Sequence, residues 1–327
     1  MLFEKYRPQS WDEVVGQEDN IRDLKGILAK CKSSGVKAPN LMFVGPAGNG
    51  KTTCAQIFAK NYLGSDWKTR TIELNASDSR RISDIRETVK PLSRTAVVKV
   101  IIMDESDRLT TDSQHAMRRI METSPTTTFI LIGNNEWEFI EPIKSRCTFF
   151  SFTPLTDEQV FAKLLDVCNK ENISINYESE NVKAGFRALI SYAKGDLRKA
   201  IGNLERLITS GKEISESNVA ALEPINLVRD TLGLAFRGYL VGAKDKFLDQ
   251  YIMTAGDSKT MVRAFFDVIN EVPDMEVKAR LWNRLADIEH NILHGADPMI
   301  QFIAFVSFAW VVPHVPKACP VVSKELM

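Results

Sequence analysis

The fold of this chain is decided by Gly45-Pro-Ala-Gly-Asn-Gly-Lys51-Thr52. This stretch fits the pattern G-x-x-x-x-G-K-[ST], in which glycines let backbone N–H groups face phosphate oxygens at the start of a helix. In that pattern Lys51 reaches the β- and γ-phosphates and Thr52 offers its hydroxyl to Mg²⁺. An apolar strand, Leu41–Val44, precedes the loop and a helical pattern follows it. This context favours a nucleotide site over a chance glycine-rich turn.

Strand-like and helix-like segments alternate on both sides of this loop. The expected strands are Leu41–Val44, Thr69–Leu74, Val100–Met103, Phe129–Ile132 and Thr148–Phe152. The expected helices are Asn20–Cys31, Lys51–Leu63 (closed by Gly64), Ile82–Ser93 and Asp112–Thr123. Strands that alternate with helices predict βαβ units and a parallel sheet.

From about Thr156 the pattern becomes entirely helical. Expected helices are Asp157–Glu171, Ser179–Ala193 and Asp196–Thr209, and Glu223-Pro224 predicts a break before a last helical block. We therefore expect three segments: an α/β core over residues 1–154, a small helical segment over 155–224 and a helical domain over 225–327.

Composition excludes several classes of protein. Lys+Arg and Asp+Glu number 42 each, so a nucleic-acid partner must be held by local charge. The five cysteines form no CxxC pair, which argues against a zinc site and fits reduced intracellular thiols. The first ten residues carry charges where a signal peptide needs apolar residues, so we expect no secretion. The apolar run Met299–Val312 is shorter than the about 20 residues of a membrane span and predicts a buried helix.

A second motif ends an apolar strand with two carboxylates. It reads Val100-Ile-Ile-Met-Asp104-Glu105, and a buried strand alone does not require acidic residues at its carboxyl end, where ligands bind in α/β sheets. We expect Asp104 to hold Mg²⁺ and Glu105 to orient or deprotonate the attacking water.

Further motifs occur in a family-specific order. Glu4-Lys-Tyr-Arg-Pro8, the P-loop, the box Asp104–Asp107, the triplet Ser145-Arg146-Cys147 and Gly195-Asp-Leu-Arg198 follow one another along the chain. With them, the chain resembles AAA+ clamp-loader subunits of the replication factor C small-subunit type, densely over residues 3–205. The resemblance implies an AAA+ core, a helical lid and a C-terminal collar that holds subunits together, although the aromatic C-terminal block would equally suit a core within one chain.

The resemblance implies roles for individual residues. Arg146 is an arginine finger for the neighbouring subunit's ATP, and Arg118 assists it in trans. The implied ATP contacts are Tyr6, Arg7, Pro8, Val15, Gly45, Pro46, Ala47, Gly48, Asn49, Gly50, Lys51, Thr52, Thr53, Asn134 and Arg198. Lys51 and Glu105 are the expected catalytic residues in the subunit's own site. The alternatives without a functional role are a surface arginine at 146, a turn residue at 134, a solvated helix face at 118 and 198, and an ordinary extended arm at Glu4–Pro8.

A basic segment predicts contact with DNA. Residues 68–99 contain eight basic and four acidic side chains, a local excess suited to phosphate contacts. Helix starts after Asp78 and at Thr111-Asp-Ser-Gln114, which has capping-box spacing, would add backbone N–H groups. The expected DNA contacts are Arg80, Arg81 and Arg86, and the alternative is an ordinary basic surface.

The same segment carries an apolar stripe at helical spacing. In the family it docks on the sliding clamp, which would make Ile85, Val89 and Leu92 clamp contacts, whereas such a stripe is more often core. The implied function is that of an intracellular, ATP- and Mg²⁺-dependent ATPase subunit in a pentamer with a large subunit, which loads a ring clamp onto primer-template DNA, with no membrane partner. Alternatives are another AAA+ remodeller (a branch-migration motor or an initiator) or a nucleotide-binding scaffold without turnover.

Overall fold

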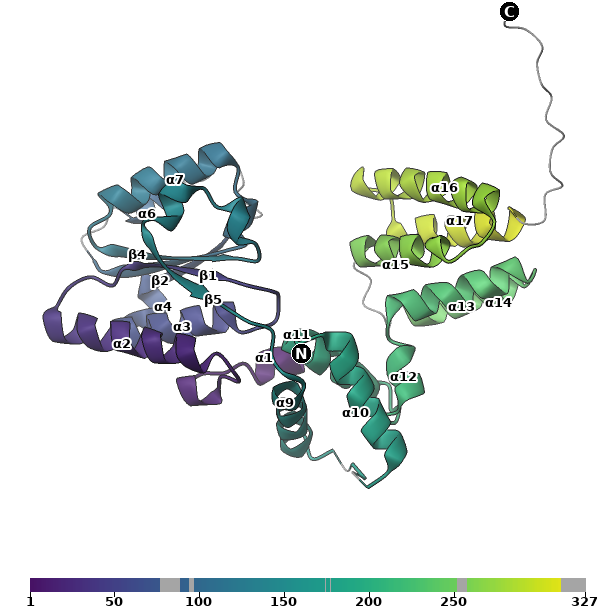
Figure 1. Cartoon of the computed structure of the whole chain (residues 1–327), viewed down its shortest axis with the longest axis horizontal. Helices are drawn as coiled ribbons and strands as arrows, with labels where there is room; N and C mark the ends of the chain where they lie inside the picture. Colours follow the sequence, from purple (N-terminus) through teal and green to yellow (C-terminus); the bar gives the residue numbers. More distant parts are fainter. Residues whose placement is uncertain (77–88, 94–96, 174, 177, 252–257, 313–327) are drawn as a thin grey trace, which may run out of the picture. The chain divides into compact units, whose positions relative to one another are not determined.

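The computed structural model describes residues 1–76, 89–93, 97–173, 175–176, 178–251 and 258–312, with backbone only at 92–93 (Figure 1). It divides into two compact units. The first comprises Met1–Ile175 and Leu189–Glu205, and the second comprises Asn176–Ala188 and Arg206–Met327. The three segments expected, with borders near residues 154 and 224, stay a prediction.

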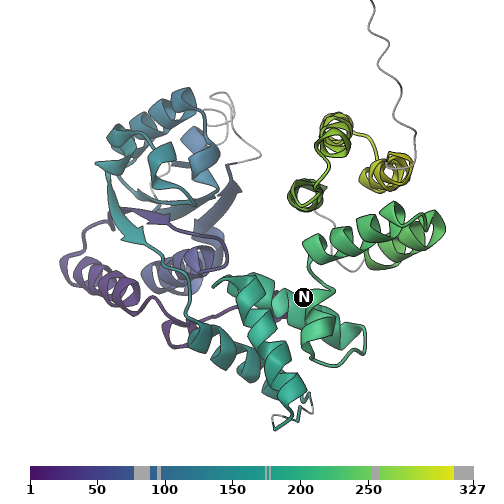
Figure 2. The ribbon, with the colours of Figure 1, turned by 45° about the vertical axis from the view of Figure 1, so that its right-hand side comes forward.

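The described part of the first unit contains a five-stranded parallel sheet in the order β2-β3-β4-β1-β5 (Figure 2). Its strands are β1 (Asn40–Val44), β2 (Thr71–Asn75), β3 (Lys99–Asp104), β4 (Thr127–Gly133) and β5 (Cys147–Ser151). The predicted parallel α/β core is confirmed. The strand expected from Thr69 begins two residues later, because Trp67–Arg70 form a short helix, α4.

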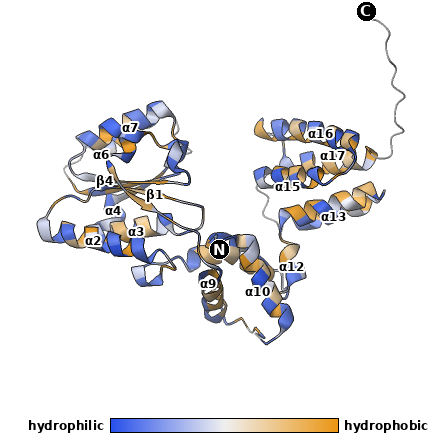
Figure 3. Cartoon of the chain, viewed as in Figure 1, coloured by the Kyte–Doolittle hydropathy of each residue, from blue (hydrophilic) through white to orange (hydrophobic). Residues whose placement is uncertain are grey.

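Helices cover both faces of this sheet. α2 (Glu18–Ser34) and α3 (Lys51–Leu63) pack on the face of Phe43, Val100 and Ile130. α7 (Thr111–Thr123) and α8 (Glu141–Lys144) pack on the opposite face. Successive strand residues point to alternate faces, and a sheet buried on both faces needs nearly continuous apolar strands. The strands are accordingly mostly orange in Figure 3, whereas α2 carries both colours.

Helix ends follow the local sequence. α3 runs from Lys51 to Leu63 as predicted and ends at Gly64, whose positive φ of 72° favours glycine. The expected capping box at Thr111 is wrong: the cap of α7 is Thr110, whose hydroxyl accepts from Ser113 N. A capping box instead starts α9 (Asp157–Lys170), where Thr156 and Gln159 exchange both hydrogen bonds.

Short elements and further helices complete the first part of the chain. The short elements are α1 (Leu2–Lys5), η1 (Trp11–Glu13), η2 (Gly64–Asp66), α6 (Lys90–Ser93), η4 (Ser106–Arg108) and η5 (Glu136–Glu138). After α9 come α10 (Glu180–Ala193), α11 (Leu197–Thr209) and α12 (Glu216–Ala220). The bounds of α9, α10 and α11 agree to within one residue with the three helices expected after Thr156. Of the helix expected over 82–93, residues 82–88 lie outside the described part of the chain.

The last helices form the core of the second unit. They are α13 (Pro224–Phe236), α14 (Leu240–Tyr251), α15 (Ser258–Asn270), α16 (Met275–Leu293) and α17 (Pro298–Val311). The buried rings of Phe247, Phe265, Phe302 and Phe305 contact one another. The predicted buried helix near the end is therefore confirmed, and its phenylalanines form a core within one chain. Over the described ranges, no helix combines the length and apolarity that crossing a membrane requires.

Candidate functional site

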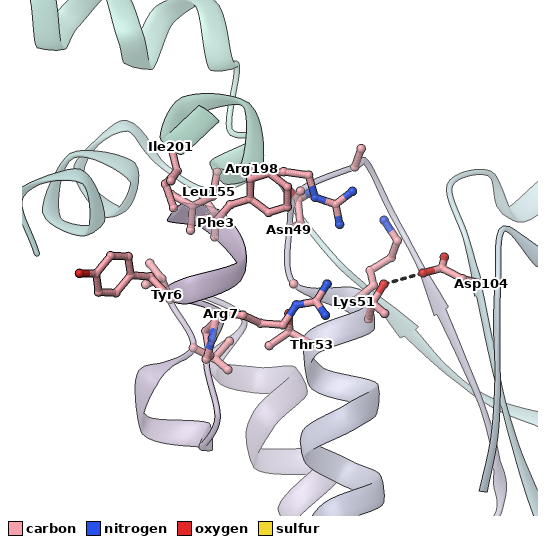
Figure 4. A pocket seen from close by; sticks show the side chains of 18 of the residues that line it. Phe3, Tyr6, Arg7, Asn49, Lys51, Thr53, Asp104, Leu155, Arg198 and Ile201 are labelled. Atoms are coloured by element: carbon pink, nitrogen blue, oxygen red, sulfur yellow. Dashed lines mark hydrogen bonds between the residues drawn. The ribbon is translucent and has the colours of Figure 1, made fainter. Parts of the chain in front are cut away.

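A cavity of about 550 Å³ lies at the carboxyl ends of the strands in the first unit (Figure 4). Ligands bind at this edge in α/β sheets, and the volume is typical of small-molecule sites. The predicted nucleotide contacts that line it are Tyr6, Arg7, Pro8, Val15, Ala47, Gly48, Asn49, Gly50, Lys51, Thr52, Thr53, Asn134 and Arg198. Asp104 and Glu105 line it as well.

The loop between β1 and α3 needs its glycines. Gly48 has a φ of 76°, and a Cβ there would collide with the Asp196 carboxylate. Gly50 has a φ of 89° and precedes the first turn of α3, so the free N–H groups of that turn face the cavity edge. The amide of Asn49 is 3% exposed and has no hydrogen-bond partner among the described residues.

The Lys51 ammonium is 7% exposed and held by oxygen acceptors. Its Nζ donates to the carbonyls of Gly45 and Pro46, each at 2.7 Å, and to Asn134 Oδ1 at 3.3 Å. Gly45 and Pro46 are thus partners of this lysine and do not line the cavity. Burial lowers the pKa of Lys51 below its usual value, while Asp104 and Asp107 oppose that change. A phosphate oxygen would be a stronger partner for this cation than the two carbonyls.

Thr52 and Asp104 form the pair expected of a magnesium site. Thr52 Oγ1 donates to Asp104 Oδ2 at 2.7 Å, the dashed contact of Figure 4. Asp104 Oδ1 accepts from the N–H of Glu105 at 2.9 Å. Hydroxyl and carboxylate oxygens are hard ligands, and Mg²⁺ is bound by one or two such groups together with substrate phosphates. The donor set therefore fits Mg²⁺.

Glu105 is held in an unusual backbone conformation. Its φ of 52° is left-handed, which costs free energy for a residue with a side chain. Its Oε2 lies 2.9 Å from Nη1 of Arg108, in the turn η4 that follows. The carboxylate thus lines the cavity while it is paired with a cation of its own loop.

Asp107 supports this site and was missed by the sequence analysis as a functional residue. It is 6% exposed, and its Oδ2 accepts from the N–H groups of Asn134 at 2.8 Å and Asn135 at 3.4 Å. This contact orients the loop after β4, so that the Asn134 side chain meets Lys51. The signal was present, because Asp107 is the last acidic residue of the Asp104–Asp107 box.

The N-terminal arm, residues 1–8, closes the other end of the cavity. The Tyr6 hydroxyl donates to Glu171 Oε1 at 2.6 Å, and Lys5 Nζ lies 2.5 Å from the same oxygen. Arg198, from α11, lies over the ring of Phe3 at 5.9 Å from the ring centre. Figure 4 shows Phe3, Asn49 and Arg198 together beside the cavity. The apolar lining of the cavity includes Val14, Val15, Leu155 and Ile201.

Arg146 and Arg118 are not among the residues that line this cavity. Arg146 precedes β5, and its backbone carbonyl accepts from Asn40 Nδ2 at 3.5 Å. Asn40 begins β1, whereas the P-loop follows the end of β1. Since β1 and β5 are parallel and start together, Arg146 lies at the strand-start edge of the sheet, opposite the P-loop.

Several predicted contacts lie outside the described residues. These are Arg80, Arg81, Ile85 and Arg86, and the side chain of Leu92. Val89 is described and is 1% exposed, packed in the cluster of α7 and the sheet. For Val89 the structure supports the core interpretation of the stripe, and the clamp contact of this segment stays a prediction.

The sequence predicted Gln114 only as part of a helix start, whereas in the structure its side chain bonds to the backbone of another segment. Its Nε2 donates to the carbonyls of Leu109 at 3.2 Å and Glu138 at 2.8 Å, and its Oε1 accepts from Ile140 N at 2.9 Å. This buried side chain therefore fixes α7 to the segment after Asn134. A lone Gln at a helix start carries no sequence signal for such a contact.

Comparison with known proteins agrees with this geometry. The model of the family described as "ATPase family associated with various cellular activities (AAA)" matches residues 41–155. The replication factor C small subunit 2 of Pyrobaculum arsenaticum is 43% identical over 91% of this chain and 92% of its own length. The small subunit of Archaeoglobus fulgidus is 34% identical over 93% of this chain and 95% of its own. The Thermotoga maritima RuvB Holliday junction branch migration motor has a TM-score of 0.54 at 19% identity, over 80% of this chain and 92% of that one, which shows the fold alone.

The parallel sheet, the P-loop and the paired Thr52 and Asp104 define a P-loop ATPase of the AAA class. Within that class the similarity extends over nearly the whole chain. The chain belongs to the replication factor C small-subunit family.

Proposed function

We infer that this chain is an ATPase subunit of a sliding-clamp loader, and that each ATP is hydrolysed at the boundary between two subunits. Family membership supports the clamp-loading role. The observation that carries the shared site is the position of Arg146 at the edge of the sheet opposite the P-loop.

Binding of ATP uses the cavity and the P-loop. The first-turn N–H groups of α3 and the Lys51 ammonium would bind the phosphates, and the arm residues Tyr6 and Pro8 would line the adenine end. Thr52 and Asp104 would hold Mg²⁺, which neutralises phosphate charge when it is bound. Arg198 would reach the phosphates from α11 beside Phe3.

Hydrolysis needs a water oriented toward the γ-phosphorus. The water oxygen forms a bond to phosphorus, the bond to the β–γ bridging oxygen breaks, and the water's proton passes to Glu105. Oε2 of Glu105 lies 2.9 Å from Nη1 of Arg108, so the other carboxylate oxygen would accept this proton. Asn134, fixed by Asp107, would position the water or the γ-phosphate.

The position of Arg146 supports action on a neighbouring subunit's ATP and not on its own. β1 has five residues, so its two ends are about 15 Å apart at about 3.3 Å per residue. Arg146 is attached near the first end, and the P-loop follows the last. A guanidinium on the surface at that edge is placed to meet the phosphates of a neighbouring subunit, where such a residue contributes about 10³–10⁵ in rate.

The assembly itself is proposed from the family. Other clamp-loader subunits, including a large subunit, would form a pentamer that opens a ring clamp, and primer-template DNA would align Arg146 with the adjacent ATP. Arg80, Arg81 and Arg86 would contact the DNA backbone. ATP turnover should therefore rise on addition of clamp and primed DNA, whereas a branch-migration motor would translocate along DNA and be indifferent to the clamp.

The test of the shared site mixes two inactive subunits in one assembly. Arg146→Ala keeps the cavity and loses the finger, and Lys51→Ala keeps the finger and loses the phosphate cation. Each variant alone should be inactive, and the mixture should regain part of the turnover wherever the two lie adjacent in the productive order. If the mixture assembles and stays as inactive as its parents, Arg146 does not act in trans.

A further inference from the structure

One carboxylate oxygen contacts both arginines that were expected to act on a neighbouring subunit. Glu122, in the last turn of α7, has its Oε1 at 2.5 Å from Nη2 of Arg146 and at 3.8 Å from Nε of Arg118. Arg118 lies one turn earlier on the same helix, and Arg146 lies in the loop before β5. Glu122 therefore joins the two cations from different elements.

The Arg146 guanidinium is held at two other points. Its Nη1 donates to the carbonyl of Pro142 at 2.8 Å and to Ser145 Oγ at 3.2 Å. Hydrogen bonds between ionised groups are short and about twice as strong as neutral ones, so Glu122 is the strongest of the three contacts. With both Nη groups engaged, the direction of the guanidinium is fixed before any phosphate arrives.

The Arg118 side chain meets the same oxygen without a hydrogen bond. Its Nε is buried and has no hydrogen-bond partner among the described residues. Two guanidinium groups close together repel each other, and a carboxylate between them offsets that repulsion. The three side chains Arg118, Glu122 and Arg146 together keep a net charge of +1. The remaining N–H donors and the net positive charge suit the triphosphate of a neighbouring subunit.

We propose that Glu122 is a positioning residue that holds Arg146 and Arg118 as one cationic pair for the neighbouring subunit's ATP. This rests on the proposed function, in which Arg146 acts in trans. An isolated surface ion pair contributes little, but this carboxylate orients a side chain that must be aligned for reaction. A small misplacement of such a group costs much of its effect on the rate. The contribution of Glu122 is therefore expected in the rate of ATP turnover and not in the free energy of folding.

The experiment places one substitution in either of two subunits. In the mixture of Lys51→Ala and Arg146→Ala, the Lys51→Ala subunit supplies the finger and the Arg146→Ala subunit supplies the cavity. Glu122→Gln in the finger subunit should lower the turnover of the mixture by about 10-fold or more. In the cavity subunit the same substitution should have no effect on turnover, because the arginine that it would position is already absent there.

Two controls separate a lost charge from a damaged fold. Glu141→Gln in the finger subunit removes a carboxylate from a nearby surface pair with Lys144 and should leave turnover unchanged. Glu122→Asp keeps the charge and should restore part of the loss. The affinity of the Glu122→Gln chain for a fluorescent ATP analogue should equal that of the unmodified chain, since Glu122 does not line the chain's own cavity.

The outcomes distinguish this proposal from the one on which it rests. An inactive mixture without any change at Glu122 contradicts action in trans. An active mixture that is unaffected or accelerated by Glu122→Gln in the finger subunit overturns the positioning role alone. An equal loss from either placement overturns it too, because a general fold defect would then explain the result.

Discussion

Thr52 Oγ1 donates a 2.7 Å hydrogen bond to Asp104 Oδ2, which joins the first turn of α3 to the carboxyl end of β3. The pair brings two hard oxygen ligands together before any ion binds. We expect Thr52→Val, which keeps the shape and removes the oxygen, to weaken Mg²⁺-dependent ATP binding at least about 100-fold, because even outer-shell partners of a metal are worth about 10–100-fold. The check is titration of a fluorescent ATP analogue with and without Mg²⁺. Thr69→Val, at an exposed hydroxyl of α4, is the control; equal Mg²⁺ dependence in both variants would exclude Thr52 as a ligand.

Replacement of Glu105 by glutamine should separate binding from turnover. The amide keeps the size of the side chain and loses the basic oxygen, so ATP should bind as before while hydrolysis falls by about 10²–10⁴. Single-turnover measurements on the assembled complex would report this, with nucleotide affinity measured in parallel. Turnover at the unmodified rate would mean that another group activates the water.

The contact of Lys5 and Tyr6 with Glu171, which tethers the N-terminal arm, should weaken at acidic pH. Hydrogen bonds from Lys5 and Tyr6 lower the pKa of Glu171 below its usual 4.5. The contact therefore stabilises the arm above pH 4.5 and is lost as the pH falls through the lowered pKa of the folded state. The same hydrogen bond raises the pKa of Tyr6 above its usual 10, so its hydroxyl stays protonated to a higher pH than that of a free tyrosine.

Hydrogen exchange of the arm amides checks this tether. After correction for intrinsic exchange, protection of Leu2–Lys5 should be constant near neutral pH and fall in acid. Glu171→Gln should release the arm already at neutral pH and weaken ATP binding, because Tyr6 lines the cavity. Glu158→Gln, on the same helix α9, is the control. Unchanged protection in Glu171→Gln would mean that other contacts hold the arm.

DNA affinity should depend on salt although the chain has no net charge. Removal of Arg80 and Arg86 should reduce the slope of log affinity against log salt by about 1.8, at about 0.9 for each phosphate contact. The loss should be similar for different sequences, since backbone contacts carry no base information. Removal of the exposed Arg22 and Arg263 is the matched control; an equal slope in both double variants would remove Arg80 and Arg86 from the DNA surface.

The stability of the second unit should depend on its cluster of buried aromatic rings. Phe302 is fully buried against Phe247, Tyr251 and Phe265, and Phe302→Ala should cost about 3–5 kcal/mol. Hydrogen exchange of amides in α15 and α17 measures this as a lower free energy of opening. Val241→Ala, at an exposed position, should change it by less than about 0.5 kcal/mol. Equal effects of the two substitutions would contradict the burial of Phe302.

The local parts of this protein could be predicted from its sequence. Helix α3 was predicted with both ends because glycines, Gly50 and Gly64, supply the positive φ angles at its borders. The strands were located to within two residues, and the three central ones, β1, β3 and β4, have the nearly continuous apolar runs that a sheet covered on both faces needs. The P-loop and the Asp104–Asp107 box were recognised because each is a short contiguous pattern.

The contacts between residues far apart in the chain could not be predicted and follow from the packing of the whole unit. The strand order sets β4 beside β1, so Asn134 reaches Lys51, and the packing of α7 brings Glu122 to Arg146. The cap of α7 is Thr110, one residue before the position expected, although the neighbouring Thr111 also carries a hydroxyl of the kind that caps helices. The physical reason is that periodicity and propensity report the burial and backbone preference of each segment, whereas contacts between segments depend on the register and packing of the whole unit.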